Sequence, residues 1–99
     1  MFILSVAAQL TYAIPGDLFE SDFGSGNIYE FTPGGTRSTF ASGVGPAGLA
    51  FNSAGNLFEA DFGSGNIYEF TPGGTRSTFA SGLAEPNYLA FEPVPEGSN

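Results

Sequence analysis

The sequence predicts an all-β protein built from repeated four-stranded antiparallel units, and three observations support this fold class. Residues 22–43 recur unchanged at 61–82, an offset of 39 residues. The chain holds 15 Gly and 7 Pro among 99 residues, which suits a protein with many tight turns. No window spaces its apolar residues at i, i+3, i+4 and i+7 over the length of a helix.

Each repeat contains four short apolar or aromatic runs separated by turn residues. In the second copy the predicted strands cover residues 48–51, 56–61, 66–70 and 76–81. The segments between them are rich in Gly, Pro, Asn and Ser, and glycine supplies the positive φ angles that tight hairpins need. Four strands joined by hairpins every 39 residues is the pattern of a β-propeller blade.

The repeat boundaries predict how the chain is organised. The first blade spans residues 9–47 and the second spans 48–87. Residues 88–92 are predicted to be the first strand of a third blade, because Leu-Ala-Phe recurs there, and residues 93–99 form a polar, Pro-rich tail. In the first blade, residues 9–14 align with the first strand. The apolar residues 1–8 are either a strand or the remnant of a signal peptide.

The middle hairpin of each repeat has a predicted register. On a strand, Glu59 and Asp61 share one face, and Ala60 points to the other. If Ala60 pairs with Ile67, then Glu59 lies opposite Tyr68. A slip of one residue would set Glu59 opposite another glutamate, and directly opposed like charges are unfavourable. We therefore expect the first register.

Residues 46–61 carry a pattern that resembles a known repeat. Their sequence, PAGLAFNSAGNLFEAD, is similar to the NHL-type repeat of six-bladed, TolB-like β-propellers, which include gluconolactonase-like and streptogramin-lyase-like proteins. The resemblance covers residues 9–91 and implies that the Gly-Leu-Ala-Phe strand is innermost and the Ser-Thr-Phe-Ala-Ser strand outermost. The chain departs from the pattern at Glu20 and Glu59, where such proteins usually carry an apolar residue.

Two blades cannot cover their own outer faces. A blade has two apolar faces that its neighbours bury, and closed propellers have about four to eight blades. Three copies joined head to tail in a ring would supply six blades, if the rotation between them closes. We therefore expect a partial propeller that forms a homo-oligomeric ring. The alternatives are a fragment or open monomer lacking the other blades of a longer parent chain, and another kind of assembly.

Charge and composition exclude several function classes. Two basic residues against ten acidic ones give a net charge of −8, and the chain has neither His nor Cys. A Ser-His-Asp triad, a Cys-His pair and the usual zinc sites are therefore excluded. The acidic surface disfavours nucleic acids and anionic membranes, and the apolar N-terminal stretch is too short to span a bilayer.

The carboxylates are the remaining candidates for chemistry. Glu20 and Asp22 recur as Glu59 and Asp61, and together with Asn52 they are the candidate ligand- or metal-binding residues. Charges buried between blades are costly, so either the glutamates reach solvent near the blade rims or their pKa values rise. We interpret the carboxylates first as solvated groups at the rims. One alternative is a channel that binds a cation, such as Ca²⁺ or another divalent ion, or a polyol. A second is acid–base catalysis by a carboxylate pair. No catalytic residue is predicted.

The expected function is that of a non-catalytic β-propeller repeat module, a structural scaffold or a scaffold that binds a carbohydrate, another protein or its own copies. Near identity of the two blades favours this interpretation, because an active site usually needs different residues from different blades. The resemblance implies the alternative, a metal-assisted lactonase-type hydrolase or lyase with a divalent ion at the channel mouth.

Both ends of the sequence suggest export. Residues 1–13 resemble the end of a secretory signal peptide, although the basic segment is missing. Val94-Pro95-Glu96 resembles the start of a bacterial PEP-CTERM sorting tail, with Gly97 in place of its second Pro. The expected location is therefore periplasmic or extracellular, in a bacterium.

Overall fold

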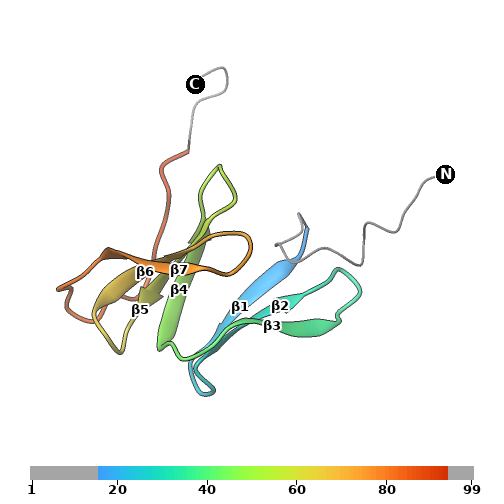
Figure 1. Cartoon of the computed structure of the whole chain (residues 1–99), viewed down its shortest axis with the longest axis horizontal. Helices are drawn as coiled ribbons and strands as arrows, with labels where there is room; N and C mark the ends of the chain where they lie inside the picture. Colours follow the sequence, from blue (N-terminus) through green and yellow to red (C-terminus); the bar gives the residue numbers. More distant parts are fainter. Residues whose placement is uncertain (1–15, 94–99) are drawn as a thin grey trace.

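The computed structural model describes residues 16–93, and the elements formed by these residues are seven strands in two antiparallel sheets, with no helix (Figure 1). The first sheet has the order β1 (Leu18–Asp22), β2 (Asn27–Phe31) and β3 (Arg37–Ala41). The second has the order β4 (Pro46–Phe51), β5 (Leu57–Asp61), β6 (Asn66–Phe70) and β7 (Arg76–Ala80). The all-β prediction is confirmed, and each sheet is a meander of consecutive strands.

Glycine-rich turns define where the strands begin and end. In the turn between β5 and β6, the Gly65 N–H donates to the Asp61 carbonyl at 3.0 Å, and Gly65 has a φ of +79°. The turn between β1 and β2 repeats this geometry, with Gly26 bonded to Asp22 at 2.9 Å. A residue with a Cβ atom is strained at such a φ, so glycine is required at these two positions.

The pairing of β5 with β6 has the predicted register. Ala60 lies opposite Ile67 and Glu59 lies opposite Tyr68. In the first sheet, Glu20 lies in the same way opposite Tyr29. The two carboxylates of β5 therefore share one face of their sheet, and no glutamate opposes another across the hairpin.

Each sheet has two different faces, which we name by their residues. The Glu face carries Glu20 in the first sheet and Glu59 in the second, and the Phe face carries Phe19 or Phe58. The sheets pack so that the Phe face of the first sheet meets the Glu face of the second, and β1 lies beside β4 (Figure 1). The buried core between them is formed by Ile28, Val44, Leu57 and Phe70.

One predicted strand has no strand partner in the described part of the chain. Residues 88–92 were expected to open a third blade, but they form no strand. A strand needs a neighbour for its backbone N–H and C=O groups, and no described strand of this chain lies where that neighbour would have to be. The predicted strand at 9–14, the apolar segment 1–8 and the tail from residue 94 onward lie outside the described residues. Within residues 16–93 there is no helix with the length and hydropathy needed to span a membrane.

Candidate interaction surface

The interface between the two repeats is built on aromatic contacts. The Phe19 ring meets Phe51 edge to face, with centroids 4.9 Å apart, and Phe40 meets Phe70 at 5.8 Å. The Ser21 hydroxyl donates to the carbonyl of Ala47 at 2.8 Å, which fixes β4 against β1. Such ring pairs stabilise a contact by about 0.5–1.5 kcal/mol beyond the area they bury.

The same contacts recur one repeat further along the chain. The Phe58 ring meets Phe91 at 5.0 Å, as Phe19 meets Phe51 in the first repeat. The Leu83 N–H donates to the Gly65 carbonyl at 2.9 Å, where the preceding repeat has the bond from Val44 to Gly26 at 3.2 Å. Residues 83–91 therefore cover the part of the Phe face of the second sheet around Phe58, as residues 44–51 cover the first sheet around Phe19, and they leave Phe79 exposed.

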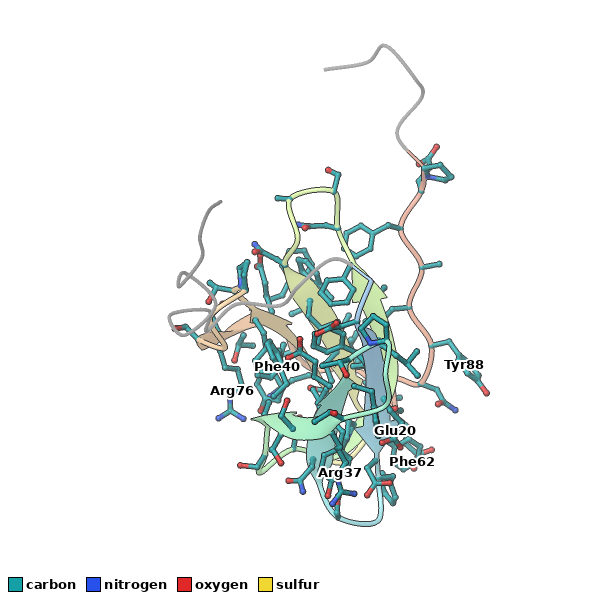
Figure 2. The ribbon with its side chains drawn as sticks, turned by 90° about the vertical axis from the view of Figure 1, so that its right-hand side faces the viewer. Glu20, Arg37, Phe40, Phe62, Arg76 and Tyr88 are labelled. Atoms are coloured by element: carbon teal, nitrogen blue, oxygen red, sulfur yellow. The ribbon has the colours of Figure 1, made fainter. Side chains whose placement is uncertain are left out.

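The two packed sheets leave large apolar side chains exposed on their two outward faces, the Glu face of the first sheet and the Phe face of the second. Leu18 on the Glu face of the first sheet is 65% exposed, whereas its counterpart Leu57 is 1% exposed. Phe79 on the Phe face of the second sheet is 63% exposed, whereas its counterpart Phe40 packs against Phe70. Figure 2 looks at the side of the molecule on which the first sheet lies, with Glu20 and Arg37 labelled on that sheet.

Glu59 is fully buried in the interface, and neither of its carboxylate oxygens has a hydrogen-bond partner. Burial and, to a lesser extent, the charge of Asp61 raise the pKa of Glu59 to about 8, against an opposing effect of Arg76. The prediction of solvated rim carboxylates is therefore wrong for Glu59. Its burial follows from the first sheet, which covers the Glu face of the second.

Asp61 is also buried, and it has a structural partner. Its Oδ1 atom accepts a hydrogen bond from the Gly45 N–H at 2.8 Å. A Cβ atom on Gly45 would lie 2.9 Å from this oxygen, so glycine allows the close approach. Asp61 thus ties the segment before β4 to the end of β5, and the rim interpretation fails here for the same reason as at Glu59.

The other predicted site residues are separated from Glu59. Glu20 and Asp22 lie half-buried on the Glu face of the first sheet. The first sheet therefore separates them from Glu59 and Asp61. Burial, the charge of Asp22 and a hydrogen bond with its side chain raise the pKa of Glu20, and Arg37 opposes them. Asn52 lies in the turn before β5, and its Oδ1 accepts from the N–H groups of Ala54 and Asn56.

The five predicted residues are therefore not gathered in one site. Glu20 and Asp22 form one pair, Glu59 and Asp61 form another, and Asn52 lies apart in a turn. Among residues 16–93, no three or more carboxylates gather in a group that could hold a metal ion. None of the five is identified as a metal ligand by this geometry. Glu59 and Asp61 lie in an interface, where the first sheet covers them.

A hollow at the junction of the repeats was not predicted from the sequence. Its volume is about 390 Å³, and Phe23 and Phe62 on its wall meet edge to face at 6.1 Å. Its other lining residues are Ser21, Pro46, Ala47 and Asn87. The repeated Asp-Phe-Gly of the two hairpins was the available signal, since it places one Phe in each equivalent turn.

Comparison with known proteins found no relative. No protein-family model matches the sequence, and no curated protein matches it. The resemblance to the NHL-type repeat accordingly rests on the residues quoted for it.

Proposed function

We propose that this protein is a non-catalytic β-propeller repeat module that acts as a structural scaffold by binding further copies of itself head to tail. One observation carries the proposal. The interface inside the chain joins two kinds of surface, and each kind is also present, in part uncovered, on an outward-facing side of the two packed sheets. The Phe face of the second sheet is one, and the Glu face of the first sheet is the other.

The sequence identity of the repeats makes these surfaces complementary. The Phe face of the first sheet contacts Leu57 and Phe70 in the second sheet. Their counterparts on the open Glu face are Leu18 and Phe31, which are the same residue types at the same strand positions. A second copy can therefore present to Phe79 the partners that Phe40 already has inside the chain.

Burial of apolar side chains supplies the driving force. Fully burying a Leu or Phe side chain contributes about 1.5–3 kcal/mol relative to leaving it in water. Docking would cover Leu18 and Phe79, which are 65% and 63% exposed. Large apolar side chains grouped at two opposite faces are typical of protein-binding surfaces.

A head-to-tail contact uses two different surfaces, so every copy added leaves one of each uncovered until a ring closes. Three copies of two blades would close a ring of six. The lactonase-type alternative gains no support from the geometry, because its candidate carboxylates lie as two pairs on opposite sides of the first sheet.

Sedimentation velocity over a range of concentrations tests the proposal. We expect a species of about three times the 10.2 kDa mass of the chain. Phe79→Asp places a charge on the docking face, where burial is costly, and should return the protein to the monomer. Thr36→Asp is the matched control, since it adds the same charge at an exposed turn between β2 and β3. A folded wild-type monomer at all concentrations would contradict the proposal.

A further inference from the structure

The outer edge of β1 has a specific candidate partner, and the inference rests on the proposed self-association. We propose that residues 86–91 of one copy pair as an antiparallel strand with β1 of the next copy, completing its first sheet to four strands. The interaction surface is thus a sheet edge as well as a sheet face, and its occupant is a second copy of this chain.

The two sheets differ in the strand with which they begin. The second sheet begins with β4, which pairs along β5. The first sheet begins, among the described residues, with β1, the counterpart of β5. The edge of β1 that corresponds to the β4 side of β5 therefore has no described strand beside it. Edge strands present a row of backbone N–H and C=O groups that readily accept another strand.

The sequence of residues 86–91 is close to that of β4. They match β4 at four of six positions, namely Pro86, Leu89, Ala90 and Phe91. Residues 7–12, which align with β4 in the first repeat, match its sequence at only two positions. The C-terminal segment is therefore the better copy of the strand that pairs with β5.

Residues 86–91 also lie in a position equivalent to that of β4. Residues 86–91 already lie against the Phe face of the second sheet, through the contact of Phe91 with Phe58 at 5.0 Å. They form no strand with any described residue. In Figure 2 this segment runs along one side of the molecule, and Tyr88 points away from the ribbon. Residues 86–91 thus pack against the second sheet as β4 packs against the first. They lack the paired strand that β4 has in β5.

The pairing of β4 with β5 provides the register. Leu49 lies opposite Glu59, and Phe51 lies opposite Leu57. The same register sets Leu89 opposite Glu20 of the next copy, and Phe91 opposite its Leu18. Phe91 and Leu18 are 45% and 65% exposed in the single chain, and the pairing would bring them together.

Two positions differ between β4 and residues 86–91: Asn87 replaces Ala47, and Tyr88 replaces Gly48. A Cβ atom at Gly48 would collide with the Asn87 carbonyl, so β4 needs glycine there. The residue opposite Gly48 is Ala60, whereas the first sheet has Ser21, whose hydroxyl holds the Ala47 carbonyl above β1. In the proposed register Tyr88 would lie opposite Ser21 of the next copy, at the position that Gly48 holds opposite Ala60.

Intermolecular disulfide formation tests the register, and the chain offers a clean background because it has no cysteine. Glu20→Cys and Leu89→Cys are made as separate variants, mixed in equal amounts and oxidised. Residues directly opposite on paired strands have Cβ atoms about 4.5–5.5 Å apart. We expect the mixed dimer to form at least tenfold faster than with Asp22→Cys in place of Glu20→Cys, since residue 22 is displaced along the same strand.

Two results would separate this inference from the proposed function. Association with equal cross-linking at residues 20 and 22, or with none, would overturn the strand pairing and leave the scaffold proposal standing. No association of the wild type in sedimentation velocity would overturn both. The wild-type chain provides a second measurement that needs no variant: amide hydrogen exchange in β1 should slow at least tenfold when copies associate, and unchanged exchange in the associated state would contradict the pairing.

Discussion

Glu59 lies between the two sheets, and Glu20, its counterpart in the first repeat, lies on the outer face of the first sheet. Both residues stand opposite a tyrosine in the same register, Tyr68 or Tyr29. Only Glu59 is fully buried, because only its face is covered by another sheet. The two repeats therefore provide matched pairs of positions that differ in burial and hardly at all in local sequence.

The free energy of unfolding should fall as the pH rises from about 4.5 to about 8. The pKa of Glu59 is raised to about 8 in the folded chain from an ordinary value of 4.5, so the folded state binds more protons than the unfolded state in this window. The contribution of Glu59 to stability is greatest below pH 4.5 and is lost as Glu59 ionises toward pH 8. Each pKa unit corresponds to about 1.4 kcal/mol, which makes the effect a few kcal/mol in all. Urea unfolding at pH 5, 6.5 and 8, below the association concentration, measures it. A flat or rising profile would show that Glu59 is not buried as described.

Replacing Glu59 by leucine should stabilise the chain by about 2 kcal/mol at pH 7.5 and flatten that pH profile. The change removes a buried carboxyl group without hydrogen bonds, and apolar replacements of buried unsatisfied polar groups are often stabilising. Glu20→Leu is the matched control. On the uncovered face it should change the unfolding free energy of the monomer by less than about 0.5 kcal/mol. Equal effects of the two substitutions would count against the packing of the two sheets.

Leu57→Ala should cost about 2–5 kcal/mol of stability, because Leu57 is buried in the core beside Ile28 and Phe70. The same change at Leu18, which is 65% exposed, should cost less than about 0.5 kcal/mol in the monomer. Chemical denaturation at low protein concentration gives both values. A large loss at Leu18 under these conditions would mean that its face is already covered within a single chain.

The hairpin turn between β5 and β6 should not tolerate a side chain at Gly65. Its φ is +79°, and a Cβ atom would lie 2.6 Å from the Leu83 carbonyl. Gly65→Ala should therefore cost about 1–3 kcal/mol and loosen residues 83–91 from the second sheet. Gly24→Ala is the control, since nothing lies within 4 Å of the added atom there. Thermal unfolding with hydrogen exchange over residues 83–91 measures both effects, and two equally stable variants would contradict the turn geometry.

The strands and their register could be predicted because they depend on local sequence. The alternation along β5, together with the repulsion between directly opposed glutamates, was sufficient to pair Ala60 with Ile67. Burial could not be predicted in the same way. Leu18 and Leu57 have nearly identical neighbours in sequence, and what distinguishes them is which face another sheet covers. Residues 88–92 illustrate the same limit, because a strand-like sequence forms a strand only beside a partner.

Association between copies should weaken as the pH rises, because docking places Glu20 in the environment that Glu59 already occupies. Burial, Asp22 and the hydrogen bond with it already raise the pKa of Glu20 in the single chain, and a covering sheet would remove more of its solvent. The docked state would then bind a proton that the free state releases, so the dissociation constant should rise at least tenfold between pH 5.5 and pH 8. Glu20→Leu should bind more tightly than the wild type at pH 8 and lose this dependence. Sedimentation velocity of both proteins at the two pH values measures the effect. If Glu20→Leu kept the same pH dependence of association, a group other than Glu20 would be responsible for that dependence. Glu59 titrates inside each copy, so its ionisation should influence folding more than association.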